Sequence, residues 1–272
     1  MTNTWEEDKG RFWAEHADHF SRQLAGFLPA VLDGARLQPG DRVIDIGSGG
    51  GDLSIAAGRA VGPEGSVVGV DLSADEVAVA VQRVADAGLD HVTFEVGDAG
   101  AVQLSPPFDV LVSRFGVMFF TDPVATFTHL HSLLVDTGRL SFVAWTRYED
   151  NPWLTIPMDA IASVAELAPL PVSGTPGPYG LAEETDVRQV LGDAGFSDIA
   201  LDRVTADVDY GDDIDRAAAF IRQMDLARAT LDHQPEEIQA AAVDAVRATF
   251  DAHRGSDGLR FPGNVWRVTA HA

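Results

Sequence analysis

Between residues 42 and 145, short apolar runs rich in β-branched side chains alternate with segments of helical periodicity. Strands at this spacing, separated by helices, pair in parallel through right-handed crossovers. The runs are apolar throughout, as expected for strands covered on both faces. We therefore predict an α/β fold with a doubly wound, mostly parallel sheet. The predicted strands are Arg42–Ile46, Ser66–Val70, Val92–Val96, Phe108–Ser113 and Arg139–Trp145, and the predicted helices are Leu53–Val61, Ala74–Ala87 and Pro123–Leu134.

The regular alternation is lost after Trp145, where prolines and glycines become frequent. Two further strands, Phe196–Val204 and Asn264–Ala270, bring the predicted sheet to seven strands. Helical patterns cover Trp5–Leu32, Leu154–Leu167, Glu183–Ala194, Ile214–Leu231 and Pro235–Ala252. We interpret residues 1–272 as one domain. Its core spans residues 40–145, and a helical cap comes from residues 1–36 and two insertions, 147–182 and 206–258.

Composition excludes several classes of function. The chain has 42 acidic and 19 basic residues, a net charge of −23, which disfavours binding to nucleic acids and anionic membranes. It contains no cysteine, which excludes disulfides, thiolate metal sites and cysteine nucleophiles. There is no apolar run long enough to cross a bilayer, and the start of the chain does not read as a signal peptide. We expect a cytoplasmic location.

The strongest local signal is the glycine-rich segment Gly47-Ser48-Gly49-Gly50-Gly51 between the first strand and the first helix. Glycines there allow a sharp turn and bring a ligand close to the main chain. Asp45 precedes the segment and Asp52 follows it, and the segment has no lysine. Carboxylates at this place would repel a pyrophosphate, so the pattern favours a cationic ligand or one with an ammonium group.

Two more acidic residues follow neighbouring strands. Asp71 ends the second strand, at the distance from the glycines typical of a residue that accepts from ribose hydroxyls. Asp98 lies beyond the third strand, where a carboxylate can accept from an adenine amino group. Together with Asp45, they predict a site for an adenosine with a positively charged amino-acid tail.

These motifs resemble class I S-adenosylmethionine-dependent methyltransferases, in particular the branch of ubiquinone/menaquinone C-methyltransferase-like and small-molecule enzymes. The segments that carry the resemblance are Val43–Gly51, Val70–Leu72, Gly97–Ala99, Phe108–Ser113 and Asp136–Leu140. The resemblance implies a Rossmann-like methyltransferase fold, S-adenosyl-L-methionine as cofactor, and methyl transfer to an O, N or C atom of a small molecule. The cofactor contacts it implies are Asp45, Gly47, Ser48, Gly49, Gly51, Asp71, Leu72, Asp98, Ala99, Ser113, Arg114 and Phe115.

Two alternatives stay open at this point. One is a homologue that retains the cofactor but catalyses a non-methylating step such as cyclisation. The other is a nicotinamide-dependent oxidoreductase, which the acidic glycine-rich segment disfavours. The sequence leaves the substrate, the accepting atom and the oligomeric state undetermined.

Few side chains outside the motifs suggest chemistry. His16 and His19 lie three residues apart on the first helix, and either is a candidate general base, although a solvent-exposed face is the alternative. Arg114 is interpreted as half of a structural ion pair with Asp109 or Asp122, or else as a contact for an anionic substrate.

No metal site is expected, and the alternative is a magnesium site built from Asp98, Asp122 and a neighbouring residue. Aromatic residues are abundant, and those on the cap could line a pocket for an aromatic or polyketide-like substrate rather than pack in the core. Tyr179 is a candidate hydrogen-bond partner for a substrate or a packing residue. The candidates for such a pocket come from Trp13, Phe20, Phe115, Met118, Phe119, Phe120, Trp145 and Trp153.

Overall fold

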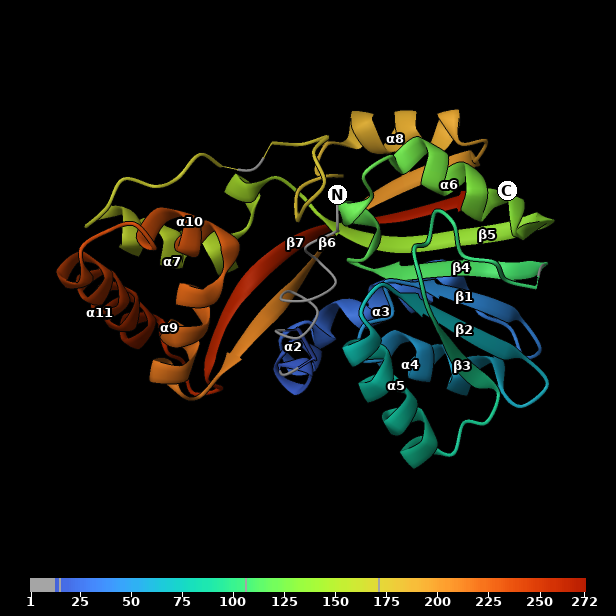
Figure 1. Cartoon of the computed structure of the whole chain (residues 1–272), viewed down its shortest axis with the longest axis horizontal. Coiled ribbons are helices and arrows are strands. Elements are labelled where there is room, and N and C mark those ends of the chain that lie inside the picture. Colours follow the sequence, from blue (N-terminus) through green and yellow to red (C-terminus); the bar gives the residue numbers. More distant parts are fainter. Residues whose placement is uncertain (1–12, 15, 106, 171) are drawn as a thin grey trace.

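The computed structural model describes residues 13–14, 16–105, 107–170 and 172–272. Its described residues form one seven-stranded sheet with the order β3-β2-β1-β4-β5-β7-β6 (Figure 1). The strands are β1 Arg42–Ile46, β2 Ser66–Asp71, β3 Val92–Val96, β4 Phe108–Arg114, β5 Leu134–Trp145, β6 Ser197–Gly211 and β7 Leu259–His271. The strands from β1 to β5 pair in parallel, and β7 pairs antiparallel with β5 and β6. The prediction of a doubly wound, mostly parallel seven-stranded sheet is confirmed.

Helices cover both faces of the sheet, with α4 and α5 on one side and α6 and α8 on the other (Figure 1). The helices are α2 Ala17–Gln23, α3 Leu28–Ala35, α4 Asp52–Val61, α5 Ala74–Ala87, α6 Pro123–Ser132, α7 Pro152–Ala162, α8 Glu184–Asp193, α9 Ile214–Gln223, α10 Asp225–Leu231 and α11 Glu236–His253. Single 3-10 turns occur at Ala25–Phe27, Val117–Phe119 and Tyr148–Asp150. None of the described helices combines the length and the apolar character that a bilayer crossing demands.

The predicted elements between residues 42 and 145 agree with the structure to within a few residues. Arg42–Ile46, Ala74–Ala87 and Val92–Val96 match without any shift. The largest difference is in β5, which begins at Leu134 rather than at Arg139. Capping residues fix both ends of α5. The Ser73 hydroxyl accepts from the Glu76 N–H at its start, and Gly88 ends the helix in the left-handed conformation.

The N-terminal region differs from the continuous helix predicted over Trp5–Leu32. Its part before Trp13 lies outside the described residues, and the rest is divided into α2 and α3. Helix α3 packs on β4, β5 and β7, so this part of the predicted cap belongs to the covering of the sheet. The close approach depends on Gly34, since a Cβ there would lie 2.4 Å from Ser141 Oγ.

One boundary and one helix of the predicted cap differ from the structure. Residues 206–211, assigned to the second insertion, are the end of strand β6 and pair with residues 259–263 of β7. Val208 and Tyr210 in this segment are buried, which stabilises the extended strand. The helix predicted over Ile214–Leu231 is broken at Met224, whose backbone is extended, and becomes α9 and α10.

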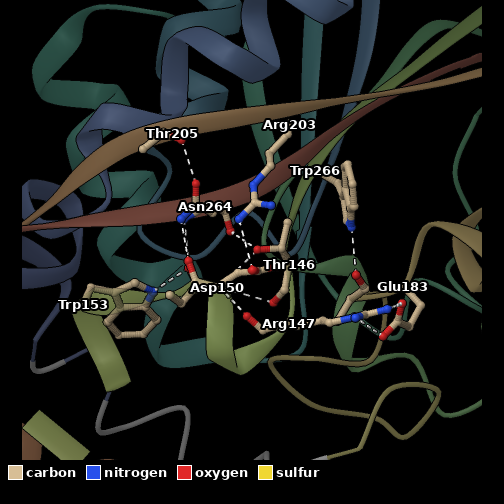
Figure 2. Close-up of polar contacts among 11 residues, drawn as sticks. Thr146, Arg147, Asp150, Trp153, Glu183, Arg203, Thr205, Asn264 and Trp266 are labelled. Atoms are coloured by element: carbon tan, nitrogen blue, oxygen red, sulfur yellow. Dashed lines mark hydrogen bonds and ion pairs between the residues drawn. The ribbon is translucent and has the colours of Figure 1, made fainter. Parts of the chain in front are cut away.

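The long strands β6 and β7 carry the cap away from the main sheet, toward α9 and α11 (Figure 1). A polar cluster joins these strands to the segment after β5 (Figure 2). Asn264 Oδ1 of β7 accepts from the Thr205 hydroxyl at 2.7 Å, and the Thr146 hydroxyl donates to the Asn264 carbonyl at 3.0 Å. Arg203 pairs with Asp150 at 3.2 Å. The cluster fixes the base of the cap to the sheet.

Candidate active site

The glycine-rich segment forms a bend directly after β1. Gly47, Gly49 and Gly51 have φ values of +67°, +49° and +86°, a region that side chains with a Cβ rarely adopt. The bend also crosses another backbone closely, because a Cβ on Gly47 would lie 2.6 Å from Gly116 Cα. Gly116 belongs to the segment after β4. The bend therefore sits between the carboxyl ends of β1 and β4, which is the switch point of the sheet order.

Asp71 at the end of β2 holds the bend in place. Its Oδ2 accepts from the Gly49 N–H and its Oδ1 from the Ser73 N–H, both at 2.9 Å. Burial raises the pKa of this carboxyl above its usual value, and the backbone donors oppose that shift. Leu72 and Asp71 both line the cavity described below.

The third acidic position lies beyond β3. Asp98 Oδ1 accepts from the Gly100 N–H at 2.8 Å, which closes a tight turn. Asp98 and Ala99 line the same cavity as Asp71. The structure thus brings together the carboxylates predicted at adjacent strand ends, because parallel strands end at one edge of the sheet.

Asp45 is fully buried inside the bend. The Ser54 hydroxyl donates to its Oδ2 at 2.6 Å, whereas its Oδ1 has no partner among the described residues. Burial raises the pKa of Asp45 to about 7, against the lowering effect of Ser54 and Arg114. The carboxyl therefore changes charge near neutral pH.

Glu76 is a cavity residue that the sequence analysis did not identify. It lies in the first turn of α5, and a Cβ on Gly49 would come within 3.3 Å of its Oε1. Burial, and next the charge of Asp71, raise the pKa of Glu76 to about 8. Its position five residues after Asp71 was the only available signal, and a first-turn glutamate is more often a capping residue.

Two residues in the predicted cofactor set do not line the cavity. Ser113 is fully buried, and its hydroxyl donates to the Ile46 carbonyl at 2.7 Å and accepts from the Gly116 N–H at 3.2 Å. It ties the β1 bend to the segment after β4. Gly51 faces helix α5, where a Cβ would lie 3.0 Å from Ala80 Cβ. Both residues support the bend from outside the cavity wall.

A network of charged groups fastens helix α2 to the bend. Asp52 Oδ2 accepts from the Ser21 hydroxyl at 2.7 Å and from Arg114 Nη2 at 2.8 Å. Arg83 Nη1 donates to the Gly50 carbonyl at 3.0 Å and to the Ser21 hydroxyl at 3.1 Å, and its other terminal nitrogen pairs with Asp18. The ion pair predicted for Arg114 therefore exists, but its partner is Asp52 rather than Asp109 or Asp122.

These elements surround a cavity of about 1370 Å³. One part follows the strand ends and is lined by Gly47, Ser48, Gly49, Gly50, Asp71, Leu72, Glu76, Asp98 and Ala99. The other part reaches the cap and is lined by aromatic and apolar side chains, among them Trp13, Phe20, Phe115, Met118, Phe119, Phe120, Trp145, Trp153, Tyr179 and Phe220. A pocket for one drug-sized ligand has about 300–1,000 Å³. The cavity is large enough for two ligands side by side.

Comparisons with known proteins agree with this geometry. Residues 37–166 match the family model described as "Methyltransferase domain". These residues are a methyltransferase domain. The match spans β1 to α7 and includes the glycine bend, Asp71 and Asp98, so the predicted family resemblance is confirmed.

Curated relatives are methyltransferases of small molecules. An arsenite methyltransferase from Halobacterium salinarum is 26% identical over 61% of this chain and 40% of its own length. A ubiquinone/menaquinone biosynthesis C-methyltransferase from Teredinibacter turnerae is 32% identical over 44% of this chain and 48% of its own length. The chain therefore spans about half or less of the length of these relatives.

Solved structures share the fold at low sequence identity. The superposition on the YcgJ protein from Bacillus subtilis covers 90% of this chain and 97% of that protein, at 17% identity and a TM-score of 0.58. The superposition on the cyclase SpnF covers 98% of this chain and 85% of that protein, at 21% identity and a TM-score of 0.54. The arrangement of strands and helices outside the methyltransferase domain therefore also recurs in solved structures.

The two predicted general bases lie outside the cavity of the methyltransferase domain and its cap. Neither His16 nor His19 is among the lining residues. His19 is 4% exposed, packs on Phe220 with ring centroids 4.3 Å apart, and has a pKa lowered to about 4, chiefly by burial and next by Arg216. Helix α2 turns other residues toward the cavity, including Phe20 and Ser21, so the structure does not place either histidine in the cavity wall.

Within the described ranges, no group of three or more histidine, aspartate or glutamate side chains is arranged to hold a metal ion. Asp122, one of the residues of the alternative magnesium site, instead caps helix α6 by accepting from the Ala125 N–H at 3.0 Å. Phe115 has a φ of +67° and stacks on Trp145 with ring centroids 4.4 Å apart. It lies in the cavity wall, next to Gly116.

Proposed function

We propose that this chain is an S-adenosylmethionine-dependent methyltransferase that acts on an O, N or C atom of a small molecule. The observation that carries the proposal is the position of Asp71 and Asp98 at adjacent strand ends, beside a positive-φ glycine bend, in one cavity. This set of groups suits a nucleoside with an amino-acid tail better than it suits a pyrophosphate, because carboxylates surround the bend and no lysine lies in it.

The residues present fit this cofactor. Asp45 Oδ1 and Ser48 Oγ are buried polar atoms without a partner among the described residues, and both residues line the cavity at the bend. A buried polar atom without a partner costs free energy that a bound polar ligand can recover. The bend also lies close to Glu76, since a Cβ at Gly49 would lie 3.3 Å from Glu76 Oε1.

Each part of the cofactor has a candidate partner. Asp71 would accept from the ribose hydroxyls, and Asp98 with Ala99 would bound the adenine. The bend Gly47–Gly50 would pack against the methionine part, with the Asp45 and Glu76 carboxyl groups near its ammonium group, whose positive charge would favour their ionised forms. The bound cofactor supplies an electrophilic methyl group, which passes to the accepting atom while sulfur keeps the bonding electron pair.

The chain's own contribution is to orient the reactants and to exclude water. Methyl transfer needs the accepting atom, the methyl carbon and the sulfur in line, and fixed geometry accounts for much of such a rate acceleration. Phe115 and Trp145 contribute apolar rings to the cavity wall, which helps to exclude water. No base is assigned, because neither His16 nor His19 reaches the cavity.

An organic acceptor fits this chain better than arsenite does. Trivalent arsenic is a soft centre for which thiolates are the natural protein ligands, and the chain contains no cysteine. The net charge of −23 supports a small-molecule acceptor over a nucleic acid. A cytoplasmic location and the absence of a membrane partner belong to the same proposal.

Isothermal titration calorimetry with S-adenosylhomocysteine tests the cofactor assignment. We expect the wild-type chain to bind the nucleoside, and Asp71→Ala to bind it at least about tenfold more weakly, because two hydrogen bonds to a carboxylate are lost. Asp90→Ala, a change at an exposed loop carboxylate, is the matched control and should leave the affinity unchanged.

A titration with NADH is the comparator for the rival oxidoreductase. Tighter binding of NADH than of S-adenosylhomocysteine would overturn the proposal. Product analysis then separates methyl transfer from cyclisation, because only methyl transfer releases one S-adenosylhomocysteine per product.

A further inference from the structure

Three carboxyl groups meet at the glycine bend, and the protein satisfies them to different degrees. Asp45 is fully buried, with one oxygen bonded to the Ser54 hydroxyl and the other closed off from solvent. Both oxygens of Asp71 accept from backbone N–H groups. The Glu76 carboxyl has no hydrogen bond to any described residue, and its oxygens are not among the polar atoms closed off from solvent. Glu76 therefore has the carboxyl group that the protein leaves unbonded and open to the cavity.

Glu76 faces the bend from the first turn of helix α5. A Cβ on Gly49 would lie 3.3 Å from its Oε1 and 3.7 Å from its Oε2, so both carboxyl oxygens lie close to this glycine. Gly49 and Glu76 both line the cavity. The proposed cofactor lays its methionine part on the bend, and a polar group of that part would come within reach of the Glu76 carboxyl.

The charged groups around Glu76 leave its carboxyl without a cation. Arg83 of the same helix is the positive group that faces it, and this guanidinium is already paired with Asp18 and, at 3.4 Å, with Asp52. The other charged groups that face Glu76 are Asp71 at the end of β2 and Asp52 of α4, and both are acidic. Among the described residues, Glu76 itself forms no ion pair.

A buried carboxylate without a partner costs several kcal/mol, so Glu76 has to be neutralised. Burial, and next the charge of Asp71, raise its pKa to about 8, and the ligand-free chain therefore holds a proton there at neutral pH. A cation within about 4–6 Å favours the ionised form and can take the place of that proton. The described acidic and histidine side chains form no group suited to a metal ion, so we expect an organic cation.

We infer that Glu76 selects a ligand with an ammonium group: its carboxylate accepts from that group, and the proton that Glu76 holds in the ligand-free chain passes to solvent when the ligand binds. The inference rests on the proposed function for the identity of the ligand, whose methionine part carries such a group. The ammonium group keeps its own protons, and no bond of the ligand is broken. Affinity should therefore rise with pH, because fewer chains then hold the proton that binding displaces. Glu76 determines specificity and takes no part in methyl transfer.

Two truncated forms of S-adenosylhomocysteine isolate the ammonium group. The decarboxylated form keeps the ammonium group without the carboxylate, and the deaminated form keeps the carboxylate without the ammonium group. Calorimetry in PIPES and in Tris gives the affinity and, from the difference in observed enthalpy, the number of protons released. At about pH 7 we expect wild type to release about one proton and to bind the decarboxylated form at least about tenfold more tightly than the deaminated form. Between about pH 6 and about pH 8, affinity for the decarboxylated form should rise about tenfold.

Substitutions assign the effect to Glu76. Glu76→Gln keeps the shape of the side chain but neither titrates nor carries charge, and it should reduce the preference for the decarboxylated form at least about fivefold and the proton release by at least about half a proton. Glu76→Asp should retain part of both. Asp75→Asn removes an exposed carboxylate from the same turn of α5 and should change neither. Methylthioadenosine, which has no amino-acid tail, should bind equally to wild type and Glu76→Gln.

The outcomes separate this inference from the proposed function. Unchanged preference and unchanged proton release in Glu76→Gln overturn it, and so does equal binding of the two truncated forms by wild type. A loss of methylthioadenosine affinity in Glu76→Gln as large as its loss of S-adenosylhomocysteine affinity also overturns it, because Glu76 would then act on the nucleoside.

In each of these cases, binding of S-adenosylhomocysteine by wild type leaves the proposed function standing. Failure of wild type to bind S-adenosylhomocysteine overturns the proposed function and this inference together. Circular dichroism shows whether the variants fold. If Glu76→Gln does not fold, the preference and proton release of wild type and Glu76→Asp decide the question.

Discussion

The two parts of the cavity are built in different ways. The cofactor part comes from short contiguous motifs at the ends of β1, β2 and β3, and its polar groups are held by backbone hydrogen bonds such as Gly49 N–H to Asp71. The cap part comes from single side chains scattered between Trp13 and Arg228, and it is mainly aromatic. A site set by backbone geometry tolerates little change in its glycines, whereas a site set by side-chain packing can change its substrate by changing its lining.

The strongest test of this difference is to add one methyl group to the glycine bend. Gly47→Ala places a Cβ 2.6 Å from Gly116 Cα, at a φ of +67°. Neither backbone can move without disturbing the β1–β4 junction. We expect a fall in S-adenosylhomocysteine affinity of at least about a hundredfold, measured by calorimetry, and a loss of more than about 2 kcal/mol in unfolding free energy in urea.

Gly88→Ala is the matched control for that substitution. Gly88 has a φ of +66° in the left-handed region, and a Cβ there would meet nothing within 4 Å. It should lose only about 1 kcal/mol of stability, the cost of the backbone conformation, and keep the full affinity. Similar losses of stability in the two variants, with affinity retained in both, would show that the crossing at Gly116 does not constrain the bend.

Dependence on pH is a second test, because two carboxyl groups of the cofactor part, Asp45 and Glu76, have raised pKa values. The pKa values of Asp45 and Glu76 rise in the fold from 3.8 to about 7 and from 4.5 to about 8. The folded chain therefore holds protons that the unfolded chain has released. This contribution to stability is complete below about pH 4 and is lost as the pH rises through about 7 to 8.

We expect the unfolding free energy of the ligand-free chain to fall by at least about 1 kcal/mol between about pH 5 and about pH 8.5. Asp45→Asn should reduce that fall, since an amide does not titrate and can still accept from the Ser54 hydroxyl. Asp90→Asn removes an exposed carboxylate and should leave the slope as in wild type. Urea unfolding across the pH range is the measurement. Identical slopes in wild type and Asp45→Asn would contradict the assignment.

The smallest expected effect concerns the link between the two parts. Arg83 joins helix α2, which contributes to the cap side, to the Gly50 carbonyl of the bend. Arg83→Gln should loosen α2 and speed dissociation of S-adenosylhomocysteine about threefold, as expected for a partly exposed ion pair and a few hydrogen bonds. Stopped-flow displacement measures the rate. Arg188→Gln, which removes an exposed pair on α8, should not change it.

The sequence predicted the cofactor part of the site better than it predicted the cap part. The bend, Asp71 and Asp98 could be placed in advance because parallel strands end at one edge, so residues next to strand ends meet in space. Glu76 was missed, since nothing in a first-turn glutamate distinguishes a buried residue from a cap. His16 and His19 could not be placed, because helical periodicity gives the shared face of two residues but not the surface that face meets. The aromatic candidates were named, but packing in the core stayed an alternative for each of them.

The sequence by itself determined the order of strands and helices from Arg42 to Trp145, the glycine bend, and the acidic strand ends, because these depend on local periodicity and on backbone conformations that few residues adopt. Only the tertiary structure decided that Gly47 crosses Gly116, that burial brings the Asp45 carboxyl close to neutral pKa, and that rings from Trp13 to Phe220 line one cavity. Those features arise from contacts between segments far apart in the chain, and their desolvation and packing exist only once the segments have met.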